Sequence, residues 1–282
     1  MPFIEYAECL RRLRTEIAAG RPIIGAGAGT GISAKFAEKG GVDLIIIYNS
    51  GRYRMAGRGS LAGLMPYGDA NQIVVDMAAE VLPVVTNTPV LAGVCGTDPF
   101  RLPRAFLPEL KRMGFDGVQN FPTVGLIDGR FRQALEETGM GIGLEVEWMR
   151  IAHEMEMLTC PYVFDEDTAT RFAEAGADVV VAHVHTTVAG SVGVTESAMS
   201  LDEAVERVQS MHDAAKRVNP EVIVLCHGGP IAQPEDARYV LDRTSGVAGF
   251  FGASSIERLA TEPAIEAQAR RFKELRVRGR AS

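Results

Sequence analysis

The chain lacks long apolar runs and an excess of positive charge, and each absence argues against one class of binding partner. No apolar run approaches the ~18 residues that span a bilayer, and the opening "MPFIEYAECLRRLRTEI" carries charges throughout, unlike a signal peptide. The formal net charge is −7, and the locally basic end "RRFKELRVRGR" is typical of a solvated last helix. We therefore expect neither a membrane nor a nucleic acid as partner.

Cysteine pairs and flexible linkers are also missing. The chain has 4 cysteines, Cys9, Cys95, Cys160 and Cys226, and none of them forms a C-x-x-C pair. This spacing predicts reduced thiols and a cytoplasmic location. No Pro/Ser-rich segment divides the 282 residues, a length that one large α/β domain reaches. We expect a single domain over residues 1–282.

What the chain does have is a regular alternation of strand-like and helix-like segments. Short apolar runs bounded by turn residues predict eight strands. They lie near 22–27, 43–48, 89–94, 116–121, 158–164, 178–184, 222–227 and 247–252. The segment "LDEAVERVQSMHDAAKRV" has the 3.6-residue period of a helix, and Ser200 and Glu203 have the spacing of a capping box. Three junctions, "EKGGVDLIII", "KRMGFDGVQN" and "AEAGADVVVA", repeat a helix end, a glycine and an aspartate that enters a strand.

Eight alternating units predict an α/β fold with a parallel sheet closed into a single (β/α)8 TIM barrel. The alternative is an open doubly wound sheet. The glycine-rich "GAGAGTG" at 25–31 suggests a dinucleotide fold, but it does not keep the G-x-G-x-x-G spacing in either frame. The barrel remains the leading prediction.

A long connection, residues 49–88, follows the second predicted strand. Loops after strands lie on the catalytic face of a barrel, so this polar, glycine-rich segment is expected to cover the mouth. Arg52, Arg54 and Arg58 within it are candidates for holding an anion, or are solvated loop charges and subunit contacts.

The last two strands end in "HGGP" and "GASS", two stretches of small residues. Loops at these positions of many barrels bind phosphate through glycine amides and a helix N-terminus. We expect an anion site there, although tight packing of two turns or simple helix capping by Ser254 or Ser255 is the alternative. The predicted substrate-binding residues are Gly228, Gly229, Gly252, Ala253 and Ser254.

Three histidines, His183, His185 and His227, end neighbouring predicted strands. They are candidates for a general acid and base or for a zinc site, and the alternative is a structural, hydrogen-bonded role. An unperturbed imidazole base would titrate near ~6.5. His153 and His212 fall within predicted helices, and we expect both at the surface.

Two glutamates, Glu145 and Glu147, lie near a predicted helix start, where the helix dipole favours carboxylates. Glu145 follows the glycine-rich "GMGIG" and could also reach the mouth.

Long stretches of the chain resemble the phosphoenolpyruvate hydrolase-like TIM-barrel family of the phosphoenolpyruvate/pyruvate barrel superfamily. They are "GAGAGTGISAKFAEKGGVDLIIIYNSGRYRMAGRGSLAGLMPYGDAN", "GVQNFPTVGLIDGRFRQALEETGMG", "VIVLCHGGPIAQPEDARYVL" and "GFFGASSIERL". The resemblance implies a substrate-holding turn at Ser33-Ala34. It also implies a magnesium site, for which Asp98 remains, whereas Asn120 stands where the superfamily has a glutamate. Mg²⁺ is therefore expected to bind weakly or only with substrate.

This resemblance implies an enzyme that cleaves a C–C or C–P bond of a small anionic oxoacid, similar to phosphoenolpyruvate or phosphonopyruvate, through an enolate-like intermediate. The alternative is a non-catalytic barrel that binds a metabolite or a protein and signals. We expect a homo-oligomer. Proton transfer is assigned to His227 and His183 with Asn120 as a substitute donor. Further substrate contacts are predicted at Gly27, Gly31, Ser33, Asn49 and Ser50.

Overall fold

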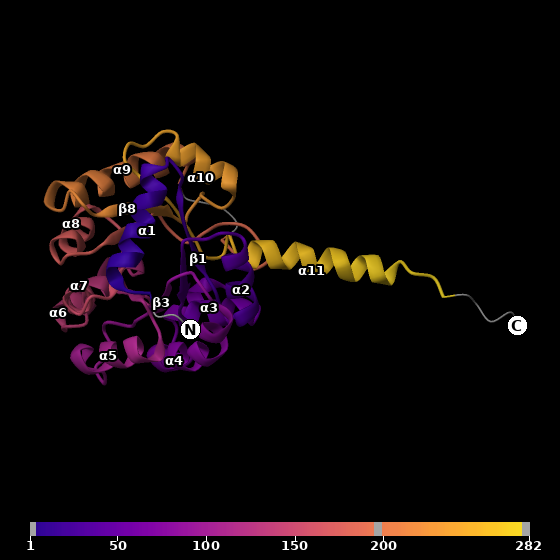
Figure 1. Cartoon of the computed structure of the whole chain (residues 1–282), viewed down its shortest axis with the longest axis horizontal. Helices are drawn as coiled ribbons and strands as arrows, with labels where there is room; N and C mark the ends of the chain where they lie inside the picture. Colours follow the sequence, from indigo (N-terminus) through magenta and orange to yellow (C-terminus); the bar gives the residue numbers. More distant parts are fainter. Residues whose placement is uncertain (1–3, 195–198, 278–282) are drawn as a thin grey trace, which may run out of the picture.

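The computed structural model describes residues 4–194 and 199–277. They form one parallel sheet surrounded by helices (Figure 1). The strands are β1 (Ile23–Gly27), β2 (Leu44–Ile47), β3 (Val90–Gly93), β4 (Gly117–Gln119), β5 (Leu158–Thr159), β6 (Tyr162–Val163), β7 (Val179–His183), β8 (Ile223–His227) and β9 (Gly249–Gly252).

The helices follow the strands in alternation. They are α1 (Tyr6–Ala18), α2 (Gly31–Lys39), α3 (Asn49–Met55), α4 (Ala70–Val81), α5 (Pro103–Met113), α6 (Gly129–Glu137), α7 (Ile142–Glu154), α8 (Glu166–Glu174), α9 (Leu201–Val218), α10 (Pro234–Leu241) and α11 (Arg258–Lys273). Short 3₁₀ segments are η1 (Ser60–Leu64), η2 (Leu82–Val84) and η3 (Val124–Leu126). None of the helices in the described part of the chain is long and apolar enough to cross a bilayer.

The fifth predicted strand closes the sheet into a barrel. The strand order is β5-β4-β3-β2-β1-β9-β8-β7-β6, and β5 and β6 are two halves of one run, separated by Cys160 and Pro161. The first half pairs with β4, where the Cys160 amide donates to Val118 O at 3.0 Å. The second half pairs with β7, where Val181 N donates to Pro161 O at 2.8 Å. One continuous run thus joins both ends of the sheet, and the predicted barrel is confirmed over an open sheet.

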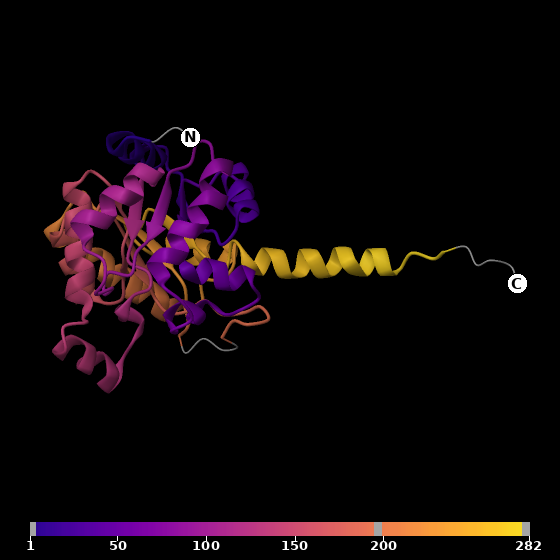
Figure 2. The same ribbon diagram turned by 90° about the horizontal axis from the view of Figure 1, so that it is seen from below.

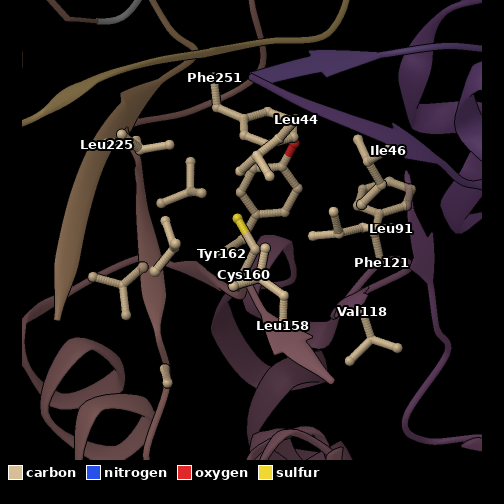
Figure 3. Close-up of a cluster of buried hydrophobic side chains, with 14 of the residues drawn as sticks. Leu44, Ile46, Leu91, Val118, Phe121, Leu158, Cys160, Tyr162, Leu225 and Phe251 are labelled. Carbon is tan, nitrogen blue, oxygen red and sulfur yellow. The ribbon is translucent and has the colours of Figure 1, made fainter. Parts of the chain in front are cut away.

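The barrel interior is filled by side chains from nearly every strand. Leu44, Leu91, Val118, Leu158, Tyr162, Leu225 and Phe251 point toward one another in Figure 3. The Phe251 ring fills the space beside Gly25 in β1. A Cβ at position 25 would therefore overlap that ring. Glycine in this strand is therefore a packing requirement.

The repeated glycine–aspartate junction has one structural role in all three places. Each aspartate accepts a backbone N–H from a neighbouring strand: Asp43 from Ile24 at 2.8 Å, Asp116 from Val90 at 2.9 Å and Asp178 from Thr159 at 2.9 Å. These bonds satisfy amides at the amino ends of the strands. The predicted capping box of Ser200 and Glu203 is also present at the start of α9.

Two expectations were wrong. The segment 49–88 is mostly helical, and only its first part covers the mouth, since α4 packs outside the sheet against β2 and β3. His212 is buried, with 8% of its surface exposed, because its ring packs against Gly246. A histidine on the inner face of an amphipathic helix counts as polar in the sequence pattern, but here one side of the ring is covered by Gly246 while Nδ1 keeps Asp213 as a partner at 2.8 Å.

Candidate functional site

A cavity of about 110 Å³ lies at the carboxyl end of the barrel. Its walls come from the ends of β2, β6, β7, β8 and β9, from the segment around η1 and from the loop after β7. We call it the mouth cavity. It is lined by Tyr48, Ser50, Arg54, Gly59, Ser60, Leu61, Phe121, Leu126, Tyr162, His183, Thr186, Thr187, Val192, Gly193, Val194, His227, Ala253, Ser254 and Arg258.

Two histidines stand side by side in this cavity. His183 and His227 are register partners on β7 and β8, with ring centroids 4.7 Å apart. His227 Nδ1 lies 2.5 Å from Phe251 O, so this nitrogen carries the proton and donates it to the carbonyl. The other ring nitrogen, Nε2, is therefore an acceptor. His185 is not part of the pair, since its backbone turns to φ 135° beyond the strand end and its ring meets Thr186.

Both paired histidines are held neutral. Burial lowers the pKa of His227 to about 4, and the nearby Arg54 charge adds to this effect. Burial and the neighbouring His227 place the pKa of His183 well below its usual value. Titration near 6.5, expected for an unperturbed imidazole, does not apply to either ring.

A buried ion pair, Arg54 and Glu257, closes one side of the cavity. Arg54 Nη2 lies 3.0 Å from Glu257 Oε2, and the two side chains are 0% and 1% exposed. Burial alone would lower the pKa of Arg54, but Tyr48 and the Glu257 carboxylate outweigh it and raise this pKa above its usual value. The N–H groups of Arg54 Nη2 do not point at the Glu257 oxygen. The ion pair is therefore close, but this buried nitrogen makes no well-aligned hydrogen bond.

A second arginine, Arg258 at the start of α11, also lines the cavity. Its Nη1 donates to Glu262 at 3.1 Å and its Nη2 donates to Ala189 O at 2.9 Å. Its Nε is buried and has no hydrogen-bond partner. Two guanidinium groups therefore border a cavity of about 110 Å³, and each has one nitrogen that makes no well-aligned hydrogen bond.

Hydroxyl groups complete the lining. Tyr48 and Tyr162 present phenols, and the Tyr48 hydroxyl lies 3.4 Å from Arg54 Nη1. Ser50 donates to Ser60 O at 2.6 Å, and the Ser60 and Ser254 hydroxyls are 3.0 Å apart. Ser50, Ala253 and Ser254 were predicted at the site, and the structure brings all three to it.

Gly228 and Gly229, whose amides were predicted to bind an anion, pack against a neighbouring loop and do not line the cavity. Gly229 N donates to His185 O at 2.8 Å, and a Cβ at Gly228 would overlap the same carbonyl. Both glycines have positive φ, 85° and 56°, so the turn needs them for its tight packing. Gly252 packs against Ile256. The tight-packing alternative therefore describes this turn.

The second predicted anion site, at Gly31 and Ser33, already holds carboxylates of the chain itself. Gly31 N donates to Glu80 at 2.7 Å, and the Ser33 hydroxyl donates to Glu257 Oε1 at 2.5 Å. Glu257 also accepts from Gly29 N at 2.5 Å. Gly27 has a different role, because a Cβ there would lie 3.0 Å from Arg54 and 3.1 Å from the Tyr48 hydroxyl. This glycine makes room for both side chains.

Asn120 is buried, does not line the mouth cavity, and has hydrogen-bond partners at both atoms of its side-chain amide. Its Oδ1 accepts from Tyr162 N at 2.7 Å, and its Nδ2 donates to Glu145 at 2.8 Å. Thr123 and the Val124 amide also donate to Glu145, at 2.7 and 2.8 Å. Burial raises the pKa of Glu145 to about 7 against these hydrogen bonds. Asn120 thus supports the break between β5 and β6, and its catalytic assignment finds no support in this geometry.

Two further predicted residues lie in supporting positions. Asn49 is buried and donates to Gly63 O at 2.9 Å. Glu147 is on the surface, paired with Arg150. Of the three arginines proposed to hold an anion, only Arg54 enters the cavity, since Arg52 pairs with Glu80 and Arg58 is exposed.

The residues around Asp98 do not fit a magnesium site. Asp98 pairs with Arg101 at 2.7 Å and accepts from Asn71 and the Phe100 amide, both at 2.9 Å. Asp98 is also absent from the lining of the mouth cavity. Within residues 4–194 and 199–277, no three His, Cys, Asp or Glu side chains are grouped so as to hold a metal ion. Weak, substrate-dependent Mg²⁺ binding stays a prediction.

Two residues at the site escaped sequence reasoning: Arg258, which lines the cavity, and its neighbour Glu257. A charged pair directly after a strand end, in "GASSIERLA", was the available signal.

Comparison with known proteins places these residues in a family context. The profile of the family described as "Phosphoenolpyruvate hydrolase-like" matches residues 8–275. The ToMV susceptible protein tm-1 of Solanum lycopersicum is 63% identical over 266 residues, which cover 94% of this chain and 35% of the relative. The ToMV resistance protein Tm-1 of the same species is 62% identical over 266 residues, with the same coverage of 94% and 35%. The chain spans about a third of the length of these two relatives.

Solved structures share the fold at low sequence identity. The phosphoenolpyruvate phosphomutase of Streptomyces platensis subsp. rosaceus has a TM-score of 0.58 at 17% identity, covering 94% of this chain and 86% of that one. A phosphonopyruvate hydrolase in complex with oxalate and Mg²⁺ has a TM-score of 0.58 at 16% identity, covering 94% and 87%. Likeness at this level shows the barrel fold alone.

Proposed function

Because the chain belongs to the phosphoenolpyruvate hydrolase-like family, we propose that it is an enzyme acting on a small anionic oxoacid, similar to phosphoenolpyruvate or phosphonopyruvate. The reaction is cleavage of a C–C or C–P bond, and the substrate lies in the mouth cavity. The related fold of a phosphonopyruvate hydrolase supports this reaction class by analogy.

The observation that carries the proposal is the pair of arginines. Arg54 and Arg258 line a cavity of about 110 Å³, a volume suited to a ligand of few atoms. Arg258 Nε is buried without a hydrogen-bond partner, and Arg54 Nη2 has only its misaligned ion-pair contact with Glu257 at 3.0 Å. A buried, unpaired N–H costs free energy, and an anionic ligand would supply the missing acceptor. Guanidinium groups favour planar carboxylates and phosphates.

The neutral histidines suit the chemistry. When the C–C or C–P bond breaks, its electron pair moves onto the oxoacid and forms an enolate. The enolate oxygen then carries negative charge until a proton returns to carbon. Arg54 and the Tyr48 hydroxyl are donors at hand for that oxygen. Water supplies the other half of the reaction: its oxygen bonds to the phosphorus or the acyl carbon as the bond to the enolate carbon breaks, which releases phosphate or a carboxylate. His227 donates its Nδ1 proton to Phe251 O, so its Nε2 is free to take the proton of that water and to pass it to the enolate carbon, which gives pyruvate.

The second candidate is a barrel that binds a metabolite or a protein and signals without turnover. Two observations favour it. The two curated relatives mentioned above carry names of virus susceptibility and resistance proteins, and Glu257 already accepts hydrogen bonds from the Gly29 amide and the Ser33 hydroxyl of the first turn.

Turnover distinguishes the two candidates. Phosphonopyruvate, which would lose its C–P bond, and acylpyruvates, which would lose a C–C bond, would be incubated with the protein, with and without Mg²⁺, and the pyruvate formed would be measured. Phosphoenolpyruvate is the comparison, because it yields pyruvate by cleavage of a P–O bond. The enzyme proposal expects pyruvate from phosphonopyruvate or an acylpyruvate and the loss of that product in His227→Gln. No product from any compound, under either condition, would favour the binding role.

A further inference from the structure

A second cavity adjoins the mouth cavity, and we call it the outer cavity. Its volume is about 660 Å³. It is bordered by the segment from Gly125 to Asp128, by α6, α8 and α9, and by the residues that end β6 and β7. Figure 2 shows α6 at the lower edge of the molecule, at the end of the barrel opposite α1. The outer cavity therefore lies at the carboxyl ends of the strands, as the mouth cavity does.

His183 belongs to both cavities. Leu126 and His183 are the two lining residues that the cavities share. The His183 ring centroid is 4.7 Å from that of His227, which lines the mouth cavity, and 5.1 Å from that of Phe164, which lines the outer cavity. A ligand that reaches from one cavity into the other therefore passes the His183 ring.

The hydrogen bonds of His183 and His227 fix opposite tautomers. The His185 backbone N–H donates to His183 Nδ1 at 3.3 Å, so the neutral His183 ring carries its proton on Nε2. This Nε2 has no hydrogen-bond partner within the described part of the chain. His227 has the reverse arrangement, with its proton on Nδ1. A ligand beside the pair thus meets a donor on His183 and an acceptor on His227.

Most charged side chains of the outer cavity already have partners. Arg132 lies 2.8 Å from Glu136, and Arg171 lies 3.5 Å from Asp167. Asp165 caps the start of α8. These groups are balanced by the chain itself and need no ligand.

Two charged side chains of the outer cavity remain, Asp128 and Arg207. Asp128 is exposed at the N-cap position of α6, where the helix dipole favours a carboxylate. Arg207 donates to Phe164 O at 3.1 Å, and no carboxylate among the described residues pairs with it. Burial lowers the pKa of His183 most, and the Arg207 charge adds to this effect. The unpaired guanidinium therefore acts on the region beside His183.

The outer cavity distinguishes the two bond cleavages named above. Phosphonopyruvate ends in a compact phosphono group and would leave the outer cavity unused. An acylpyruvate carries an acyl arm on the carbon that becomes the enolate carbon. Such an arm has a place to go, because the outer cavity begins at the His183 ring.

We propose that the substrate is an acylpyruvate whose acyl arm passes His183 into the outer cavity and ends in a carboxylate beside Arg207. This inference rests on the proposed function and narrows it to C–C cleavage. Succinylpyruvate has the required parts: an oxoacid end for the mouth cavity, an acyl carbonyl beside the histidines and a carboxylate at the end of the arm.

The reaction is hydrolysis. The oxygen of water bonds to the acyl carbon as His227 Nε2 takes one proton of that water. The acyl oxygen becomes negative, and the His183 Nε2–H donates a hydrogen bond to it. The bond between the acyl carbon and the enolate carbon then breaks, and its electron pair forms the enolate of pyruvate. His227 returns the proton to the enolate carbon, and the acid product releases the second proton of water to solvent.

Binding tests the arm without turnover. Two oxoacids of equal length that lack the acyl carbonyl, α-ketopimelate with a terminal carboxylate and α-ketoheptanoate with a terminal methyl group, would be titrated by calorimetry. The wild type should bind α-ketopimelate about 3- to 10-fold more tightly, a modest factor because Arg207 is exposed. Equal affinity for the two compounds, or no binding of either, would overturn the inference.

Variants of α9 identify the residue that reads the arm. Arg207→Met should bind the two oxoacids about equally, whereas Arg207→Lys should keep most of the preference for α-ketopimelate. Arg217→Met removes an exposed arginine of the same helix that does not line the cavity, and it should keep the full preference. An unchanged preference in Arg207→Met would contradict the place of the carboxylate.

The role of His183 is tested by the rate of C–C cleavage. His183→Leu removes the donor and should lower kcat for succinylpyruvate on the order of 100-fold. His183→Gln keeps an N–H donor near the position of Nε2 and should retain more of the rate. Equal losses of kcat in the two variants would contradict the hydrogen bond to the acyl oxygen.

Turnover separates this inference from the proposed function. The wild type should release pyruvate from succinylpyruvate with a higher kcat/KM than from butanoylpyruvate, which has a methyl group in place of the terminal carboxylate. Pyruvate from phosphonopyruvate but from neither acylpyruvate would support the proposed function and overturn the acyl arm. A preference for α-ketopimelate in binding, with no turnover of any compound, would support the arm's site and contradict the enzyme.

Discussion

The guanidinium of Arg54 and the carboxylate of Glu257 lie 3.0 Å apart, with exposed fractions of 0% and 1%. Arg54 belongs to α3, which follows β2, and Glu257 directly precedes α11. Since Glu257 also accepts hydrogen bonds from Gly29 and Ser33, this single pair ties together the loops after β1, β2 and β9. The rigidity of the mouth depends on it.

Removing one partner of this pair should destabilise the protein strongly. Glu257→Gln leaves the Arg54 charge buried without compensation, which typically costs about 3–5 kcal/mol. Urea unfolding would measure the loss. Arg52→Met, which breaks the exposed Arg52–Glu80 pair, is the control and should cost no more than about 1 kcal/mol. Similar losses of stability in both variants would show that burial does not increase the contribution of the Arg54–Glu257 pair to the free energy of unfolding.

Activity should not change with pH near neutrality, because the pKa of His227 is far below 7. A base must be neutral, and His227 has a pKa of about 4 because it is buried. Hence kcat/KM should be flat through pH 6–8 and should fall only as the pH is lowered toward 4. His227→Gln should abolish turnover, and His185→Asn, outside the cavity, should retain it. A rise of kcat/KM centred near 6.5 would contradict this environment for His227.

The buried carboxyl of Glu145 should make stability fall as pH rises. Its pKa is raised from 4.5 to about 7 in the folded protein, so between these values the folded state binds more protons than the unfolded state. The free energy of unfolding therefore decreases from about pH 4.5 to 7 and then levels off. Urea unfolding at several pH values would measure this slope.

The variant Glu145→Gln isolates this contribution. It should flatten the slope of stability against pH, although it also costs hydrogen bonds at every pH. Asp116, whose pKa is raised to about 6 by burial, adds a slope of the same sign and remains in the variant. An identical slope in wild type and Glu145→Gln would mean that Glu145 is ionised throughout.

Adding a methyl group at Gly25 should disturb the barrel core. The new Cβ would overlap the Phe251 ring, and overpacking of this kind costs about 1–3 kcal/mol. Gly143→Ala, inside α7 with its nearest neighbour 3.4 Å away, should be neutral or slightly stabilising because alanine favours helices. Thermal unfolding of both variants tests this, and equal stability of Gly25→Ala and wild type would contradict the packing.

The sequence predicted the barrel well because each signal was local. Apolar runs, the Ser200–Glu203 capping box and the repeated glycine–aspartate junction all depend on neighbours in the chain. The split at Cys160 and Pro161 was not predictable, because it depends on Asn120 and Gln119 side chains that bond to the β5–β6 backbone across the sheet. The site was found in part: a strand-end rule locates His183, His227 and Ser254, but it cannot show that Glu257 fills the first turn or that Arg101 neutralises Asp98.

Titration of oxalate into the wild type and into Arg258→Met tests most directly whether the mouth cavity is an anion site. The wild type should bind one oxalate per chain. Arg258→Met should bind it about 10- to 100-fold more weakly, since a charge-assisted hydrogen bond is worth roughly 1.5–3 kcal/mol. Arg58→Met, on the exposed loop, should bind oxalate like the wild type. No binding to the wild type, or equal binding by Arg258→Met, would contradict the account.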